Sequence, residues 1–280
     1  MNNEVIYCFS MIKDEQRYLD NWIEHNLKIG FDKIILYEDY CSSRHDVSKW
    51  KEKVVLLKMP DCFNDDEMRL MKEGVYRQHS VYDHFNRVYR DECDWFMFTD
   101  VDEFLEAQNV KRMIGKYIYD IFDIHQICFR YRIYGHSGHL KDPYPGESYS
   151  VRDTYTKECT DYKSIAALGN PFKSLVCSQE DDIPRFSKDC YNIPHMPVDP
   201  AEGDCTLIAF EKLAHYWTYS LEEYLWRLCE QGLISEESWN RTIEDFFTVN
   251  KIEMDEEAEK IIEEVTSRHA VKYNNFDIFE

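Results

Sequence analysis

The stretch EVIYCFSMIKDEQRYLDNWIEHNLKIGFDKIILY, residues 4–37, decides the fold of this 280-residue chain. It opens with an apolar run over residues 4–10 that is typical of a buried strand. Apolar residues then recur at helical spacing, and Gly30 stands where a helix commonly ends. A second apolar run follows at residues 33–37. The order strand, helix, strand predicts a βαβ unit with parallel strands.

The same alternation continues along the chain. Residues 53–58 (KVVLLK) and 95–99 (WFMFT) are apolar runs that predict two more strands, with one long helix expected over residues 75–89. We therefore expect an α/β fold with a mostly parallel, mixed sheet and flanking helices. Ligands of such sheets bind beyond the carboxyl ends of the strands. The loops after Ser10, Tyr37 and Thr99 should then converge on one crevice.

The second half of the chain has a different pattern. Residues 127–134 alternate in polarity like a half-buried strand, and residues 172–177 form another apolar run. Between them, residues 135–170 are rich in glycine, proline and polar residues, which predicts long functional loops. From residue 220 the pattern is helical. We predict one catalytic domain over 1–219 and a helical C-terminal extension over 220–280.

Charge and cysteine usage narrow the function classes. Lysine and arginine number 33 against 54 aspartates and glutamates, a net charge of −21, which repels nucleic acid. A divalent cation could supply the positive charge that a phosphorylated ligand needs. Ten cysteines are scattered without CxxC or zinc spacing, as expected in a reducing compartment.

The sequence shows no segment of the kind that targets or anchors a protein in a membrane. The N-terminus lacks the charged and apolar regions of a signal peptide. No apolar run approaches the roughly 20 residues that span a bilayer. We predict a cytoplasmic protein without an integral membrane segment, and peripheral membrane contact stays open.

Asp100-Val101-Asp102 is the strongest candidate for chemistry. Two carboxylates at the exit of a strand offer the hard oxygen ligands that Mg²⁺ or Mn²⁺ prefers. Such an ion would hold a diphosphate and stabilise the charge on a leaving nucleoside diphosphate. The alternative is an ordinary acidic turn, because D-x-D by itself is a common pattern.

The two other strand-exit loops carry polar side chains whose role the residues leave open. Lys13, Asp14 and Glu15 either cap the following helix or read the base and ribose of a nucleotide. Glu38 and Asp39 have the same two interpretations, since aspartate is also a turn residue.

Two histidines could complete the coordination of a metal held by Asp102. His195 lies in a proline-flanked loop, and His215 follows an apolar segment. Imidazole suits Mn²⁺ and other transition ions. A buried, hydrogen-bonded histidine with no metal is the equal alternative for each.

Further charged residues are candidates for proton transfer and phosphate binding. Glu180, Asp181 and Asp182 follow the strand at 172–177, and one of them could be the general base that deprotonates an acceptor hydroxyl. A solvated acidic loop is the alternative. Lys173, like Arg130 and Arg132, either contacts phosphate or lies on the solvent face of a strand.

Five blocks in fixed order, covering roughly residues 4–232, resemble a known family. They are residues 11–37, residues 94–105 (DWFMFTDVDEFL), residues 129–139 (FRYRIYGHSGH), residues 172–176 (FKSLV), and His215-Tyr216 with Ser220, Glu223 and Tyr224. Together they resemble family-2-like glycosyltransferases, closest to the group related to family 92, also called domain of unknown function 23.

The resemblance implies a GT-A fold and a hexosyltransferase that takes a nucleotide-sugar donor, often a UDP-sugar. It places Mn²⁺ or Mg²⁺ at Asp100 and Asp102 and favours inversion at the sugar. It further implies that the donor-binding residues include Lys13, Glu15, Asp39, Gln78, Asp100, Gly138 and Lys173.

The leading hypothesis is glycosyl transfer from a nucleotide sugar to a hydroxyl of a glycan or lipid-linked acceptor. A nucleotidyltransferase is a second class, but it would usually need a glycine-rich loop after the first strand, and residues 11–14 contain no glycine. A non-catalytic glycan-binding protein on the same fold is the third. The intact pair of Asp100 and Asp102 disfavours it.

Overall fold

The computed structural model describes residues 4–39, 44–59, 61–72, 77–120, 126–144, 149–158, 172–177, 206–216, 218–230 and 236–273. The chain divides into two compact units. The first unit comprises residues 1–131 and 165–214, and the second comprises residues 132–164 and 215–280. The chain thus crosses between the two units three times. The predicted domain boundary at 219/220 stays a prediction.

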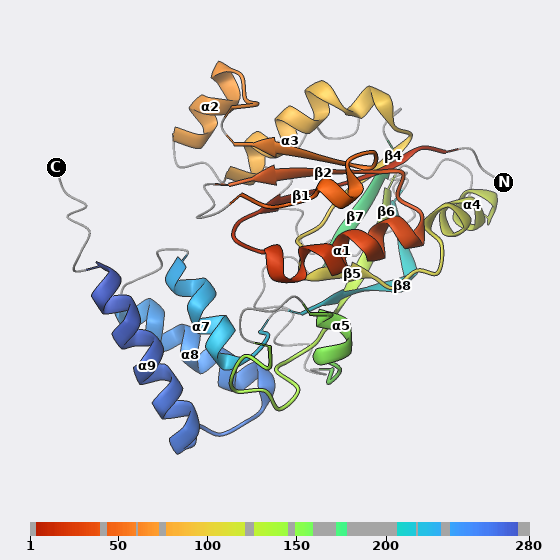
Figure 1. Ribbon diagram of the computed structural model, residues 1–280. Helices are drawn as coiled ribbons and strands as arrows, with labels where there is room; N and C mark the ends of the chain where they lie inside the picture. Colours follow the sequence, from red (N-terminus) through yellow and green to blue (C-terminus); the bar gives the residue numbers. More distant parts are fainter. Residues whose placement is uncertain are drawn as a thin grey trace. The chain divides into compact units, whose positions relative to one another are not determined.

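An eight-stranded mixed sheet dominates the first unit (Figure 1). Its strand order is β3-β2-β1-β4-β7-β6-β8-β5. The strands are β1 (Ile6–Ile12), β2 (Lys33–Glu38), β3 (Val54–Lys58), β4 (Trp95–Phe98), β5 (Glu103–Leu105), β6 (Gln126–Ile133), β7 (Phe172–Cys177) and β8 (Thr206–His215).

The first four strands are parallel. β1 pairs with β2 on one side and with β4 on the other, and β3 extends the sheet beyond β2. β7 lies between β4 and β6 and is antiparallel to both. The expected mixed α/β sheet is therefore confirmed.

Two aspartates that precede the neighbouring strands bind the backbone at the start of β1. The backbone N–H of Val5 donates to Asp94 at 2.7 Å, and that of Ile6 donates to Asp32 at 2.9 Å. Asp94 directly precedes β4 and Asp32 precedes β2, so each aspartate sets the register at which its strand meets β1.

The helices of the first unit are α1 (Gln16–Ile29), α2 (Asp65–Lys72), α3 (Arg77–Val88) and α4 (Val110–Asp120), with 3-10 turns η1 (Ser48–Trp50) and η2 (Arg90–Glu92). Gly30 ends α1 in the left-handed conformation, at φ 111°, and its N–H bonds back to the carbonyls of Asn26 and Leu27. This is the predicted C-terminal glycine cap. α1 buries Leu19, Trp22 and Ile23 completely.

α3 covers the face of the sheet opposite α1 (Figure 1). Here Phe9 of β1 stacks on Phe85 of α3, with ring centroids 4.0 Å apart. Phe96 and Phe98 of β4 and Tyr82 of α3 pack around this pair. Burying one such ring contributes about 1.5–3 kcal/mol. This aromatic cluster therefore holds β1 and β4, the two strands that lead into the candidate site.

The structure contains elements that were not predicted from the sequence, among them α2, β5 and α4. The predicted helix over 75–89 corresponds to α3, and α2 precedes it as a helix of its own. α2 begins with a reciprocal cap: Glu67 N–H donates to Asn64 Oδ1 at 2.9 Å, and Asn64 N–H donates to Glu67 Oε2 at 2.8 Å. β5 and α4 are further elements beyond the prediction.

The second unit contains α5 (Val151–Thr154), α7 (Leu221–Glu230), α8 (Glu236–Asn250) and α9 (Glu256–Tyr273). The expected helical C-terminal segment is confirmed. α7, α8 and α9 share a core centred on Leu225, Phe246 and Ile261, which are fully or almost fully buried.

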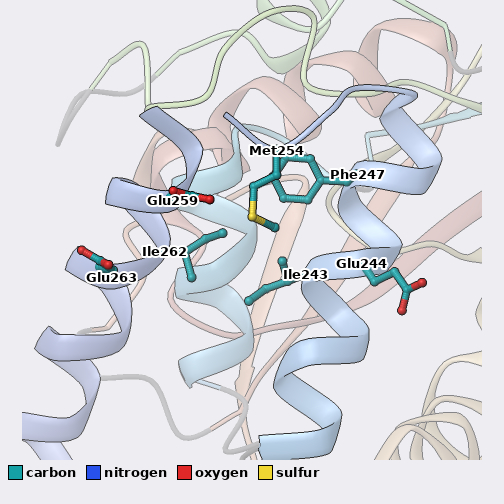
Figure 2. Close-up of a pocket in the computed structure, with 7 residues that line it drawn as sticks. All are labelled: Ile243, Glu244, Phe247, Met254, Glu259, Ile262 and Glu263. Carbon is teal, nitrogen blue, oxygen red and sulfur yellow. The ribbon is translucent and has the colours of Figure 1, made fainter. Parts of the chain in front are cut away.

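α8 and α9 leave a shallow groove of about 500 Å³ on the second unit. Figure 2 shows the apolar side chains of Ile243, Phe247, Met254 and Ile262 pointing toward one another. Glu244, Glu259 and Glu263 complete the lining. None of these seven residues is a predicted site residue.

Two properties bear on the environment of the chain. Within the described ranges, no helix is both long and apolar enough to cross a membrane. The side chains of Cys8, Cys93 and Cys128 are buried, and that of Cys62 is at intermediate burial. Burial raises the pKa of the Cys62 thiol to about 11, so it stays protonated near neutrality.

Candidate functional site

The strand order reverses at β1, which makes its carboxyl end the natural ligand crevice of this sheet. The register pairs Ile12 with Glu38 of β2 and Phe9 with Phe98 of β4. Just beyond these pairs, Asp39 N–H donates to the carbonyl of Ile12 at 2.8 Å, and Thr99 N–H donates to that of Phe9 at 3.2 Å. The loops after β1, β2 and β4 therefore leave the sheet side by side.

Asp100 and Asp102 occupy a tight turn between β4 and β5. Asp102 is buried, with 4% of its surface exposed, whereas Asp100 is partly exposed. Glu103 closes the turn twice: its backbone N–H donates to the carbonyl of Asp100, and its Oε2 accepts from Asp100 N–H, both at 3.0 Å. The indole of Trp22 in α1 donates to the carbonyl of Glu103 at 3.0 Å. The two aspartates thus stand on a fixed backbone.

Tyr131 of β6 completes this turn from the side. Its hydroxyl donates to Glu103 Oε1 at 2.7 Å, so the two oxygens of Glu103 hold Tyr131 and the Asp100 amide. Burial raises the pKa of Tyr131 well above its usual range, and the nearby charges of Glu103, Asp100 and Asp102 raise it further. Three carboxylates therefore gather around one protonated hydroxyl. From the sequence, only the strand position of Tyr131 could be predicted.

The carboxylate oxygens at this turn are ligands that suit a hard divalent cation. Mg²⁺ is commonly held by one or two carboxylates, with water and substrate phosphates as its other ligands. Across the described segments, no group of three or more His, Cys, Asp or Glu side chains is arranged to hold a metal ion. Asp100 and Asp102 thus offer a partial ligand set, of the kind that a phosphorylated substrate completes.

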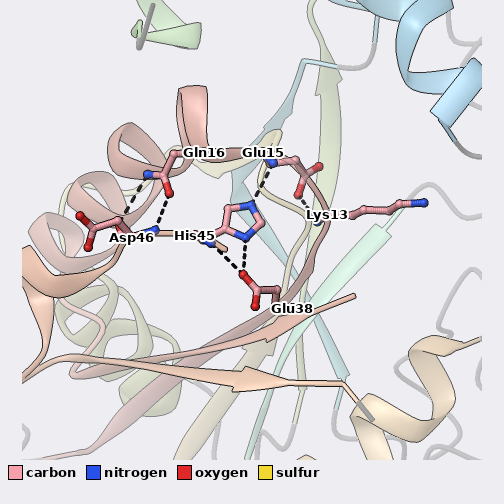
Figure 3. Close-up of polar contacts among 6 residues, drawn as sticks. All are labelled: Lys13, Glu15, Gln16, Glu38, His45 and Asp46. Atoms are coloured by element: carbon pink, nitrogen blue, oxygen red, sulfur yellow. Dashed lines mark hydrogen bonds and ion pairs between the residues drawn. The ribbon is translucent and has the colours of Figure 1, made fainter. Parts of the chain in front are cut away.

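His45 joins the loops after β1 and β2 (Figure 3). It was not among the site residues predicted from the sequence. Its Nδ1 lies 2.9 Å from Oε1 of Glu38, and its Nε2 accepts from the backbone N–H of Glu15 at 3.0 Å. Glu15 in turn accepts from the backbone N–H of Lys13 at 3.2 Å. The side chain of Lys13 points away from His45 (Figure 3).

Two aspartates follow β1 and β2 at these exits. Asp14 has φ 56°, a left-handed conformation that aspartate tolerates better than most residues. It therefore turns the chain from β1 into α1. Asp39 is buried, with 4% of its surface exposed, directly after β2.

Two further predicted donor-binding residues lie on neighbouring elements. Gln78 is in the first turn of α3, which leads back to the start of β4, so this turn faces the carboxyl side of the sheet. Lys173 is in β7, opposite Phe129 of β6. The structure describes the strand at Lys173 but not the side chain.

Gly138 and His215 belong to the second unit. Gly138 has φ 93°, which favours glycine, and its N–H donates to Nδ1 of His136 at 3.1 Å. Burial lowers the pKa of His136, as do the neighbouring Lys157 and His139, which agrees with a neutral, accepting imidazole. The carbonyl of His215 accepts from Tyr134 N–H at 2.9 Å.

Four predicted residues lie outside the described segments: the three candidate bases, Glu180, Asp181 and Asp182, and the candidate ligand His195. Their roles stay predictions. Within the first unit, the structure brings together the loops that carry Lys13, Glu15, Asp39, Asp100 and Asp102.

No protein-family model matches the chain, and no curated protein matches it. Solved structures do. S. aureus TarS matches with a TM-score of 0.40 and 10% identity, over 87% of this chain and 43% of that one. A mycobacterial protein matches with a TM-score of 0.31 and 13% identity, over 63% and 54% of the respective chains. Mouse xyloside xylosyltransferase 1, in its apo form, matches with a TM-score of 0.32 and 13% identity, over 62% and 68%. The chain thus spans less than half of TarS.

Proposed function

We propose that the chain is a metal-dependent glycosyltransferase with a GT-A fold, which moves a sugar from a nucleoside diphosphate to a hydroxyl. One observation carries the proposal. Asp100 and Asp102 leave β4 beside the exit of β1, where the strand order reverses. In such a sheet this is the place where a nucleotide binds.

The electrostatics support a cation-bridged diphosphate. Glu38, Asp39, Asp102 and Glu103 are all buried at the exits of neighbouring strands, with 1–4% of their surfaces exposed. Carboxylates so placed create a negative potential that repels bare diphosphate and attracts a divalent cation. Mn²⁺ or Mg²⁺ would reverse the sign of the local field, and its chemistry when bound is to stabilise the leaving diphosphate.

Each residue then has a role in binding. Asp102 would hold the metal, and Asp100 would contact the metal or the donor ribose. The base and ribose of a nucleotide, UDP in our proposal, would lie against Lys13, Glu15, Asp39 and Gln78. Gly138, Lys173, His215 and His195 are proposed to complete the donor and metal contacts. Glu180, Asp181 or Asp182 would deprotonate the acceptor hydroxyl of a glycan or lipid-linked acceptor, in an inverting reaction.

Calorimetry with UDP tests the donor side of the proposal. We expect UDP to bind in the presence of Mn²⁺ and to bind much more weakly after EDTA treatment, because diphosphate alone would face the acidic exits. UDP binding that is absent, or equally strong without metal, would overturn the proposal.

A hydrolysis screen tests the transfer reaction without knowledge of the acceptor. Each nucleotide sugar is incubated with the protein and Mn²⁺, and released nucleoside diphosphate is measured. We expect slow release from one donor, because water can replace the acceptor hydroxyl. Tight UDP binding with no release from any donor would instead favour a non-catalytic glycan-binding protein.

A further inference from the structure

We propose that His45 is a positioning residue of the donor site: a neutral imidazole that locks the loop after β1 to the end of β2. The inference rests on the proposed function for its meaning. Its geometry stands by itself, because His45 contacts both Glu15, one of the predicted base and ribose contacts, and Glu38, which directly precedes the predicted contact Asp39.

The hydrogen bonds assign the tautomer of His45. The backbone N–H of Glu15 can only donate, so Nε2 of His45, 3.0 Å away, must be an acceptor without a proton. The proton of the neutral ring is then on Nδ1, which donates to Oε1 of Glu38 at 2.9 Å. The backbone N–H of His45 donates to the same oxygen at 2.8 Å. One ring therefore joins two loops, and it can do so only as a neutral group.

A second set of hydrogen bonds joins the loop after β2 to α1 beside His45. The side chain of Gln16, in the first turn of α1, accepts from Asp46 N–H at 2.7 Å, and its amide donates to the carbonyl of Asp46 at 3.5 Å (Figure 3). The residues after His45 are thereby held against α1. His45 itself has 4% of its surface exposed, so its hydrogen bonds are shielded from water.

The consequence for binding follows from what the imidazole holds. Glu15 is the N-cap residue of α1, and its carboxylate fixes the backbone of Lys13. If the hydrogen bonds of His45 are lost, Lys13, Glu15 and Asp39 are no longer held at a fixed spacing. The turn at residues 100–102 keeps its own hydrogen bonds. A contact to base and ribose acts on ground state and transition state alike, so its loss raises KM and leaves kcat nearly unchanged.

Two variants each keep one half of the bridge. In His45→Asn, the amide lies near the place of Nδ1 and can still donate to Glu38, but nothing reaches Glu15. In His45→Gln, the longer amide places an acceptor near that of Nε2, which restores the bond from Glu15 N–H. His84→Asn is the matched control: His84 is also a buried imidazole in the first unit, but its ring lies 2.9 Å from the hydroxyl of Tyr37, within β2, rather than bridging the described residues of the two loops.

The experiment measures UDP affinity in the presence of Mn²⁺, KM and kcat for the donor found in the hydrolysis screen, and amide hydrogen exchange over residues 13–17. We expect His45→Asn to weaken UDP binding and raise KM about tenfold, the effect of one lost contact to the nucleotide or about 1.4 kcal/mol, with kcat within about twofold. Exchange at residues 13–17 should rise in His45→Asn and less in His45→Gln, whose KM should lie nearer to wild type.

The outcomes separate the two proposals. Equal exchange and equal KM in wild type, His45→Asn and His84→Asn would overturn the positioning role, even if UDP binds. A matching loss of kcat in His45→Asn would also overturn it, because His45 would then act on the chemistry. If no form binds UDP, the proposed function fails, and the exchange data alone decide whether His45 locks the loops. Should His45→Asn not fold, His45→Gln against His84→Asn gives the same comparison.

Discussion

Carboxylates gather in two regions of this acidic chain, and the two regions hold them differently. At the strand exits of the first unit, Glu38, Asp39, Asp102 and Glu103 are buried. On the second unit, Glu244, Glu259 and Glu263 line the groove of α8 and α9 and are exposed. Burying a carboxylate costs free energy unless hydrogen bonds satisfy it. The carboxylates at the strand exits carry this desolvation cost, whereas the exposed glutamates of the groove do not.

The contrast teaches how to read negative charge in this molecule. Glu103 and Glu38 accept hydrogen bonds from backbone N–H groups at 2.8–3.0 Å, and these bonds hold the two carboxylates in place. Exposed glutamates on α8 and α9 serve solubility and need no fixed position. Burial with backbone contacts at the strand exits, rather than acidity, therefore distinguishes the candidate site from the groove.

The largest effect is expected at Asp102. Asp102→Asn keeps the shape of the side chain and removes a charged ligand, so turnover and Mn²⁺-dependent UDP affinity should fall by about a hundredfold or more. Steady-state kinetics and calorimetry measure both quantities. If the affinity for UDP and Mn²⁺ were unchanged, the turn at Asp102 would be an ordinary acidic turn. The strand exits would then not differ in function from the groove.

Glu67 separates burial from function. This buried carboxylate accepts two hydrogen bonds from Arg87, both at 2.9 Å, and one from Asn64 N–H. Glu67→Gln should lower the free energy of unfolding by about 1–3 kcal/mol, because hydrogen bonds to a buried charge are lost. Thermal unfolding measures the change.

The control for Glu67→Gln is Glu92→Gln, which breaks the exposed pair of Glu92 with Lys33. That loss should be below about 1 kcal/mol. UDP affinity should stay at the wild-type value in both variants. A large loss of affinity in Glu67→Gln alone would extend the site to α2.

Tyr131 tests whether the fixed backbone of the exit turn matters. Tyr131→Phe removes the hydroxyl that holds Glu103, and loss of such an outer contact typically costs about 10–100-fold in metal affinity. We expect the lower end, about tenfold, in a Mn²⁺ titration of UDP binding. Tyr117→Phe is the matched control, since Tyr117 also donates to a glutamate, Glu211, in the same unit. Equal effects in the two variants would mean that Tyr131 only stabilises the fold.

The smallest effect is expected in the groove. Glu263→Gln removes an exposed charge from α9 and should change the free energy of unfolding by less than about 0.5 kcal/mol. UDP affinity should not change. Thermal unfolding and calorimetry check the two values, and a clear loss of either would show that acidity on α9 is more than surface charge.

Much of the fold could be predicted because its signals are local. The periodicity of residues 4–37 predicts β1, α1 and β2, and Gly30 predicts the end of α1. α2 and α4 had signals too, such as the Asn64–Glu67 cap, but these are short. β5 is three residues long and pairs at the edge of the sheet, so its existence depends on tertiary contacts that no local pattern encodes.

The candidate site divides in the same way. Asp100 and Asp102 follow directly from a buried strand, which a sequence shows. Tyr131 and His45 reach the site from other segments, and their roles depend on hydrogen bonds to Glu103, Glu38 and Glu15. A histidine or tyrosine in a sequence gives no indication of which distant carboxylate it will meet. The same holds for His25 of α1, whose buried ring lies 2.9 Å from the carbonyl of Leu105.

The position of β1 between β2 and β4 also sets an order of assembly on the ribosome. The hydrogen bond that anchors β2 to β1 spans 26 positions, whereas the one that anchors β4 spans 89. Synthesis adds roughly 5–20 residues per second, so β1 has one neighbour for several seconds before the other emerges. During that interval the side of β1 that will meet β4 is an open strand edge, the kind that pairs with foreign chains. The side of β1 that pairs with β4 is thus a strand edge that the nascent chain exposes until β4 has been made.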